Sequence, residues 1–331
     1  MSRLHEFINS FHPSSRELHK IMESGSGRSN YRFETDNDSF VLTQNESTEE
    51  NESFIYLSQV FKNLNGYVPE ILLVSKDKTL YVQEDLGDKS LLQLKLENNP
   101  KVSQLYEKAV KKLVHLQIGA QQIIDYSKVN GPPSFDKILV LRDLFYFKNY
   151  FLDFIDVAYS QSELLAEFDR MAEAIVQTTY RFFMFRDFQG RNIMIKENKP
   201  YFIDFQDGME GPIAYDLVSL LWQAKANLSE VEKNKLFHVY TSELKKLIPT
   251  KFKLTDFERD YNICVLVRLL QVVGAYGKLG IIQQKPHFKE SLSFGIQNLK
   301  EVANSKLMDE YPILKTICLN LKTEQLPKFK M

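Results

Sequence analysis

The stretch that decides the fold is FMFRDFQGRNIMIKENKPYFIDFQDG, residues 183–208. Its three aspartates and one of its asparagines lie close to apolar runs, namely Asp187, Asn192, Asp204 and Asp207. The segment NIMIKENKPYFIDF predicts a β-hairpin, because polar turn residues separate two apolar strands. Any one of these polar residues alone is a common turn former. Together, at this spacing, they predict a metal and proton-transfer site.

The spacing suits phosphoryl transfer. Asp187 follows an apolar strand, Asn192 lies where the hairpin starts, and Asp204 ends its second strand, so the three can meet. One carboxylate can orient a hydroxyl group, while an amide and a second carboxylate hold Mg²⁺, a hard cation that prefers oxygen ligands. The order D-x-x-x-x-N, followed by an Asp that heads a D-F-G-like triplet, is typical of phosphoryl transfer.

The pattern along the chain indicates an α+β protein with two lobes. Up to about residue 86 it predicts short strands, interrupted by one helix in STEENESFIYLSQVFKNL. From DKSLLQL onward, apolar residues recur at intervals of three and four, as they do in helices. We therefore expect a small antiparallel-sheet lobe with one helix in residues 1–86, and a large helical lobe in residues 87–331.

Composition excludes several classes of function. The 331 residues include 42 Lys and Arg against 43 Asp and Glu, which is ordinary for a globular protein. Basic residues are spread among the helices rather than gathered in a stripe, which argues against nucleic acid as a partner. MSRLHEFINSFH lacks the build of a signal peptide, and we expect no apolar run long enough to cross a bilayer. We therefore expect a cytoplasmic protein with no membrane partner; its oligomeric state is not predicted.

The two cysteines carry no functional signal. Cys264 and Cys318 lie in apolar helical patterns without a His or Cys at ligand spacing. We expect both to be core residues rather than members of a disulfide or a zinc site.

A family resemblance adds to these patterns. RDFQGRNIM and YFIDFQDGMEGPIAYDLVSLL resemble the aminoglycoside phosphotransferase and choline kinase superfamily, which has a protein-kinase-like fold. Within it, the chain looks most similar to bacterial amino-sugar kinases that phosphorylate N-acetylmuramate and N-acetylglucosamine at the anomeric hydroxyl. The resemblance runs from SGSGRSNYR to GAYGKLG and is dense between Phe183 and Ala226. It implies a small-molecule kinase that uses ATP and Mg²⁺, with a nucleotide-binding lobe in residues 1–86 and a catalytic and acceptor-binding lobe in residues 87–331.

The resemblance also implies roles for single residues. Asp187 would be the catalytic carboxylate, and Asn192 and Asp204 would bind Mg²⁺. The nucleotide site would include the glycine-bearing turn with its flanking arginines, and the junction between the lobes, where backbone groups of related folds contact adenine. Its candidate residues are Gly25, Ser26, Gly27, Arg28, Arg32 and Glu84.

Three features depart from the superfamily pattern. Phe185 stands where a His usually braces the catalytic loop, and an aromatic packed against the following strand could replace it. Gln206 and Asp207 follow the Asp-Phe pair in place of the usual Gly, as they do in the amino-sugar kinases. The strand FVLTQ lacks the lysine that kinases use to hold the α- and β-phosphates.

Another cation must therefore hold the phosphates. Arg28 and Arg32 flank the glycine-bearing turn and are candidates, although exposed strand charges explain them equally well. Glu50 or Glu52 in the lone helix could pair with that cation, although a first helical turn favours acids in any case.

The function classes that remain are a kinase and a binding protein. The first is an ATP-dependent kinase for an amino sugar, another small alcohol or an aminoglycoside. The second is a nucleotide-binding pseudokinase that has lost turnover. Residues 251–331 carry 13 basic and 8 acidic side chains, including Arg268, Lys278 and Lys285 near GAYGKLG. That excess favours a neutral or anionic acceptor over a polycationic aminoglycoside, which needs an acidic pocket.

Overall fold

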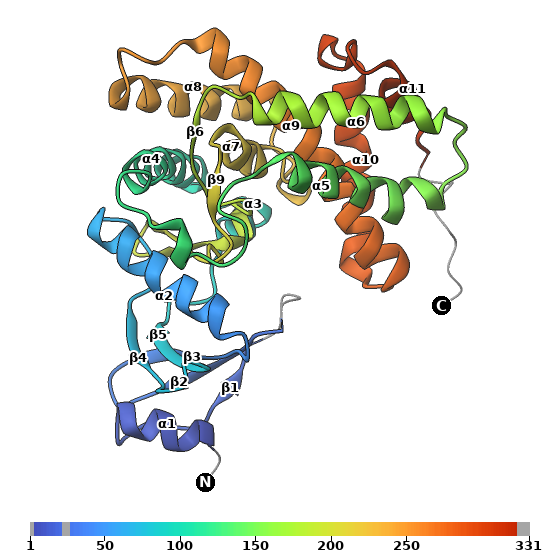
Figure 1. Cartoon of the computed structure of the whole chain (residues 1–331). Helices are drawn as coiled ribbons and strands as arrows, with labels where there is room; N and C mark the ends of the chain where they lie inside the picture. The colour runs from blue at the N-terminus through green and yellow to red at the C-terminus, as the bar shows by residue number, and fades with distance from the viewer. Residues whose placement is uncertain (1–2, 22–26, 323–331) are drawn as a thin grey trace. The chain divides into compact units, whose positions relative to one another are not determined.

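A computed structural model describes residues 3–21 and 27–322 of the chain (Figure 1). The chain divides into two compact units, residues 1–133 with 185–209 and residues 134–184 with 210–331. A small antiparallel sheet and a large helical part are present, so the predicted α+β class is confirmed. The predicted division of function between residues 1–86 and 87–331 stays a prediction.

The first unit holds the five-stranded sheet, the two helices that flank it and the hairpin of residues 193–202. Its elements before residue 134 are α1 (Arg3–Phe11), β1 (His19–Lys20), β2 (Ser29–Glu34), β3 (Ser39–Gln44), α2 (Thr48–Asn63), β4 (Ile71–Val74), β5 (Leu80–Glu84), α3 (Leu91–Leu96), α4 (Val102–Ala120) and the 3₁₀ turn η1 (Tyr126–Lys128). The later segment adds η3 (Gly190–Asn192), β7 (Ile193–Lys196) and β8 (Lys199–Phe202).

Two helices cover opposite faces of the five-stranded sheet, whose order is β1-β2-β3-β5-β4. On one face, Ile8 of α1 packs with the strand residues Phe33, Leu42, Leu80 and Val82. Side chains alternate between the faces of a strand, so Tyr81 points the other way and stacks on Phe54 of α2, with ring centroids 5.6 Å apart. Helix α1 was not predicted, although Leu4, Phe7, Ile8 and Phe11 have helical spacing.

The predicted hairpin is confirmed. Strands β7 and β8 pair antiparallel from Ile193 with Phe202 to Lys196 with Lys199. The two residues between the strands, Glu197 and Asn198, both have positive φ, as a two-residue hairpin turn requires. This turn fixes the register and therefore places the residues before β7 and after β8 at the same end of the hairpin.

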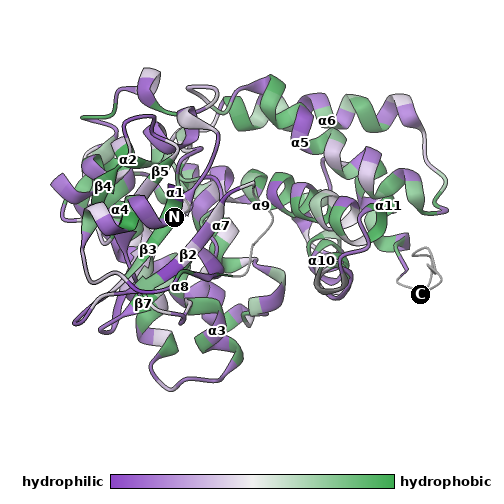
Figure 2. Cartoon of the chain, turned by 90° about the horizontal axis from the view of Figure 1, so that it is seen from below, coloured by the Kyte–Doolittle hydropathy of each residue, from purple (hydrophilic) through white to green (hydrophobic). Residues whose placement is uncertain are grey.

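The second unit is mainly helical. Its elements are α5 (Lys137–Tyr150), η2 (Leu152–Phe154), α6 (Gln161–Val176), β6 (Arg181–Met184), β9 (Met209–Pro212), α7 (Ala214–Leu221), η4 (Ala224–Ala226), α8 (Glu230–Leu247), α9 (Leu254–Tyr276), the π-helical turn η5 (Gly277–Ile282), α10 (Pro286–Ala303), η6 (Lys306–Met308) and α11 (Pro312–Asn320). Hydrophobic and hydrophilic residues alternate along α5, α6 and α10, as expected of helices with one buried face (Figure 2). Both cysteines are free and fully buried, which confirms the prediction that they belong to the core.

One helical segment contradicts an expectation from the sequence. The segment Leu254–Ile282 has a window with a mean hydropathy of 1.6 and is long and apolar enough, by length and composition, to cross a membrane. The expectation that no such run exists was therefore wrong. In that window 61% of the residues are buried within the protein, and the core helix of a globular protein meets the same criterion.

Candidate active site

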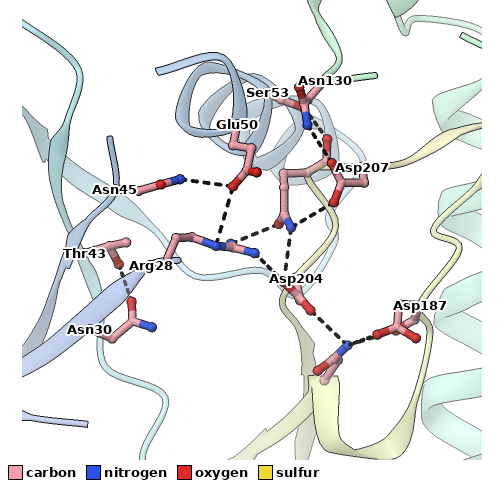
Figure 3. Close-up of polar contacts among 12 residues, drawn as sticks. Arg28, Asn30, Thr43, Asn45, Glu50, Ser53, Asn130, Asp187, Asp204 and Asp207 are labelled. Carbon is pink, nitrogen blue, oxygen red and sulfur yellow. Dashed lines mark hydrogen bonds and ion pairs between the residues drawn. The ribbon is translucent and has the colours of Figure 1, made fainter. Parts of the chain in front are cut away.

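The structure brings the three predicted catalytic and metal-binding residues together (Figure 3). The side-chain nitrogen of Asn192 lies 2.9 Å from the backbone oxygen of Asp187 and 3.4 Å from its carboxylate. The same nitrogen lies 3.4 Å from Oδ2 of Asp204. The predicted proximity is therefore observed, and the chemical roles of the three residues stay predictions.

Backbone strain flanks this cluster. Arg186, which directly precedes Asp187, has a φ of 69°, and Asp204 has a φ of 62°. Residues other than glycine are uncommon in the left-handed region, and holding one there costs about 1 to 3 kcal/mol. Such strain persists only where the surrounding structure fixes the backbone, and it is found preferentially at functional sites.

Phe185 braces the loop that carries Asp187. Its ring stacks on Phe61 of α2 with centroids 5.1 Å apart, and it meets Phe202 of β8 edge-on at 5.9 Å. The ring of Phe188, the residue after Asp187, has its centroid 5.5 Å from that of Phe185. The contact with Phe202 is the packing against the following strand that the sequence led us to expect, and the replacement of the usual His by Phe185 stays a prediction.

Arg28 is the cation that the structure places beside Asp204. Its Nη2 lies 2.8 Å from Oδ1 of Asp204, and its Nη1 donates to the side-chain oxygen of Gln206 at 3.2 Å. Its Nε lies 3.9 Å from Glu50, beyond hydrogen-bond range. Burial is the largest single influence on the pKa of Arg28 and lowers it, but the charge and hydrogen bond of Asp204, together with Tyr81 and Glu50, outweigh it, so the pKa is raised and the guanidinium stays charged.

Local structure in the sheet and α2 positions the polar residues near Arg28. The side chain of Ser47 caps α2 by accepting from the backbone N–H of Glu50, which fixes Glu50 in the first turn. Asn45 donates to the Glu50 carboxylate at 3.1 Å. Thr43 lies on β3, where kinases place a lysine; it is buried, its hydroxyl donates to Asn30 at 2.8 Å, and it supplies no charge for a phosphate.

The other candidate cation lies in a different cluster. Arg32 binds Asp85 through two nitrogens, at 2.6 and 3.1 Å, and Asp88 at 2.8 Å. Glu52, the alternative to Glu50, is paired with a lysine on the surface of the first unit. The structure therefore brings Arg28 and Glu50 to the site and leaves Arg32 and Glu52 outside it.

The structure gives less information on the remaining residues predicted for the nucleotide site. Gly25 and Ser26 lie outside the described residues, and Gly27 lies directly before Arg28 with open space around its Cα. The Glu84 carboxylate pairs with Lys196 at 2.7 Å, and its backbone N–H donates to the backbone oxygen of Glu70, just before β4, at 2.9 Å. A role for Glu84 in contacting adenine therefore stays a prediction.

Sequence reasoning missed the supporting contacts. Gln206 accepts from Arg28 and donates to Asp204 at 3.2 Å, so its amide links the two. Ser53 of α2 donates to the backbone oxygen of Gln206, and Asn130 donates to Asp207 at 2.7 Å. Ser53 and Asn130 are distant in sequence and belong to no motif, so no sequence signal could have indicated them.

The donor set fits Mg²⁺. Among residues 3–21 and 27–322, no group of three or more His, Cys, Asp or Glu could hold a metal ion. Mg²⁺ does not need such a group, because it keeps several waters and is usually bound through one or two carboxylates plus substrate phosphates. Asp204, with about a third of its side chain exposed, and the neighbouring Asn192 provide that minimal set.

Comparison with known proteins identifies the family. A model described as the phosphotransferase enzyme family matches residues 20–246. The chain belongs to this family. A kinase of Pseudomonas aeruginosa named N-acetylmuramate/N-acetylglucosamine kinase is 25% identical over 277 residues, which cover 82% of this chain and 79% of that protein.

Solved structures show the same fold. A choline/ethanolamine kinase family protein from Mesorhizobium loti has a TM-score of 0.60 at 12% identity, covering 93% of this chain and 95% of the other. A thermostable aminoglycoside phosphotransferase, APH(4)-Ia, solved as a ternary complex with ADP and hygromycin B, has a TM-score of 0.57 at 13% identity, covering 90% and 99%. The predicted kinase-like fold and superfamily are confirmed, and the chain is a small-molecule kinase.

Proposed function

We propose that this kinase transfers the γ-phosphoryl group of ATP, with Mg²⁺, to the anomeric hydroxyl of an amino sugar such as N-acetylmuramate or N-acetylglucosamine. The observation that carries the proposal is the meeting of Asp187, Asn192 and Asp204 at one end of the hairpin. The name of the P. aeruginosa relative supports the acceptor, and the ADP complex of an enzyme with this fold supports the nucleotide. Fold alone does not fix an acceptor, because choline and aminoglycoside kinases share it.

Asp187 orients the acceptor hydroxyl and accepts its proton. Arg191 donates to its Oδ2 at 3.0 Å, and Gln189 donates to its other oxygen, so the carboxylate is held in one orientation. In the reaction, the acceptor oxygen bonds to the γ-phosphorus while the bond to the bridging oxygen of ADP breaks. The proton of the acceptor hydroxyl passes to Asp187.

The nucleotide and its metal ion would be bound by Asn192, Asp204 and Arg28. Mg²⁺, when bound, would neutralise phosphate charge, and Asp204 and Asn192 would be its protein ligands. Arg28 would bind phosphate oxygens in place of the missing lysine, because a guanidinium matches the geometry of a phosphate and its Nε has no hydrogen-bond partner. Catalysis would then rest on positioning and charge neutralisation.

The test is a nucleotide and acceptor screen with the purified chain. ADP release is measured with ATP or GTP, with Mg²⁺ or EDTA, on both amino sugars, choline and kanamycin, and ³¹P NMR identifies the product. We expect a sugar 1-phosphate that requires Mg²⁺, and no turnover of kanamycin. Phosphorylation of kanamycin without activity on either amino sugar would overturn the proposed acceptor. Nucleotide binding without ADP release on any acceptor would favour a pseudokinase.

A further inference from the structure

Gln206 is a buried side chain beside the expected metal ligand, and the proposed chemistry gives it no role. It is 4% exposed, and both atoms of its amide contact charged groups. Its oxygen accepts from Nη1 of Arg28 at 3.2 Å. Its nitrogen donates to Oδ1 of Asp204 at 3.2 Å and to Oδ2 of Asp207 at 3.4 Å (Figure 3). The amide therefore lies between a guanidinium and two carboxylates.

The chemistry of these partners fixes the direction of the amide. A guanidinium only donates hydrogen bonds and a carboxylate only accepts them, whereas an amide does both. Turning the amide over would set its nitrogen against the donors of Arg28 and its oxygen against Asp204. Glutamine therefore joins these opposite charges without adding a charge of its own.

Helix α2 holds the backbone that carries this amide. The ring of Phe205 stacks on Phe54 of α2 with centroids 4.7 Å apart, and it meets Phe61 of the same helix edge-on at 5.1 Å. The hydroxyl of Ser53, also on α2, donates to the backbone oxygen of Gln206. All of these residues belong to the first unit, as do the partners of the amide.

Arg28 and Mg²⁺ would compete for Asp204. Its Oδ1 accepts from Arg28 at 2.8 Å, and its Oδ2 lies 3.4 Å from the side-chain nitrogen of Asn192, so both oxygens face donors. A metal ion at this carboxylate would draw on the negative charge that pairs with Arg28. Because the Arg28 side chain is only 14% exposed, it would then need a new partner, since a buried charge without one is costly.

Resting on the function proposed above, we infer that Gln206 is a positioning residue for nucleotide binding. It keeps Arg28 in place through a neutral hydrogen bond while Asp204 binds the metal ion, and Arg28 then pairs with a phosphate oxygen. A carboxylate at this position would bind Arg28 as Asp85 binds Arg32, and would neutralise it. The neutral amide leaves the positive charge available to the nucleotide.

The first test measures ATP affinity by calorimetry, with Mg²⁺ and with EDTA, in Gln206→Glu. Without Mg²⁺ the affinity should fall about tenfold or more, because the new carboxylate pairs with Arg28 and repels the phosphates. With Mg²⁺ the loss should be smaller, since the same carboxylate also attracts the metal ion. Gln59→Glu is the matched control, because Gln59 is exposed on α2, and it should change neither value by more than about twofold.

The second test determines whether Gln206 acts through Arg28. Gln206→Met removes the hydrogen bonds without adding charge, and it should weaken ATP binding by about two- to tenfold. In an Arg28→Met background the same substitution should add little, because the side chain that Gln206 positions is absent. Melting temperatures show whether each variant is folded. If Gln206→Glu does not fold, this cycle decides alone.

Unchanged ATP affinity in Gln206→Glu would overturn the inference. So would an equal loss with Mg²⁺ and with EDTA, or full additivity of Gln206→Met and Arg28→Met, since both results indicate a role in structure alone. If the wild-type chain binds neither ATP nor GTP, the proposed function fails and this inference fails with it. If it binds ATP but phosphorylates neither amino sugar, only the proposed acceptor fails, and the binding comparison still decides the role of Gln206.

Discussion

Two arginines, one just before strand β2 and one within it, make similar contacts with carboxylates but differ in how fully their hydrogen-bond donors are used. Arg32 lies within β2 and is bound by two carboxylates, one of them through two nitrogens. Arg28 lies just before β2 and has one carboxylate in hydrogen-bond range, Asp204, and one amide, Gln206. Its Nε is buried without a hydrogen-bond partner. Two carboxylates therefore bind Arg32, whereas Arg28 has unused hydrogen-bonding capacity beside the expected metal ligand.

This difference separates a structural ion cluster from a candidate ligand site. A bidentate pair with a second carboxylate satisfies a guanidinium, so little is gained when a phosphate approaches it. A buried donor without a partner is costly, and a bound phosphate would remove that cost. We therefore assign nucleotide binding to the Arg28 cluster and the joining of β2 to the segment after β5 to the Arg32 cluster.

The largest expected effect is that of Asp187→Asn. Loss of the proton acceptor should lower kcat by about 10² to 10⁴, because positioned general-base groups contribute that much. Affinity for ATP with Mg²⁺ should stay near the wild-type value, since Asn192 and Asp204 remain. ADP release and isothermal titration calorimetry measure the two effects. Asp88→Asn, in the Arg32 cluster, is the control, and near-normal turnover in Asp187→Asn would remove Asp187 from its role.

Asp204→Ala should act on binding rather than on the chemical step alone. Removing the carboxylate takes away a metal ligand and leaves the buried charge of Arg28 without its partner, so the Mg²⁺-dependent part of ATP affinity should disappear. Calorimetry with ATP, in the presence and absence of Mg²⁺, measures this difference. Equal affinities for wild type and variant in both conditions would show that Asp204 holds no metal.

Substituting each arginine in turn tests the comparison directly. Arg28→Met should weaken ATP binding by about tenfold or more, as expected when a charged hydrogen-bond donor is lost. Arg32→Met should leave ATP affinity within about threefold and lower the melting temperature instead, because it breaks a structural cluster. Arg28→Lys should restore part of the affinity, since it keeps the charge but not the paired donors. If Arg32→Met weakens ATP binding and Arg28→Met does not, the assignment is reversed.

The sequence could predict the proximity of the residues that flank the hairpin, but not the contact of Asp204 with Arg28. Asp187, Asn192 and Asp204 belong to one local element, so turn chemistry and strand alternation suffice to bring them together. The contact between Arg28 and Asp204 joins residues 176 positions apart. No local pattern predicts it, and because β2 begins at Ser29, the alternation of strand faces does not constrain Arg28.

Helix α1 shows the same limit. It has the spacing of an amphipathic helix, but nine residues form a stable helix only through packing on the sheet, which its own sequence does not show.

The last expected effect is on stability rather than on activity, and concerns the pH dependence of the Arg32 cluster. Burial alone would raise the pKa of Asp85, but hydrogen bonds from Arg32, Ser39 and the backbone of Gly87 outweigh it and lower the pKa. A carboxyl with a lowered folded pKa stabilises the fold above its unfolded pKa of about 4, and this contribution is lost as the pH falls through the folded value. Asp85→Asn should therefore reduce the free energy of unfolding by about 1 to 3 kcal/mol at neutral pH.

The difference between wild type and Asp85→Asn should then shrink as the pH falls below about 4, because the protonated wild-type carboxyl loses the charge that Arg32 binds. Urea denaturation at several pH values measures it, with Asp77→Asn as the control. Asp77 also has a lowered pKa, of about 2, but it is exposed and its main cause is a hydrogen bond from Ser75, so its substitution should matter little at any pH. If the difference in the free energy of unfolding between wild type and Asp85→Asn is constant with pH, the Arg32 cluster stabilises the fold through packing rather than through charge.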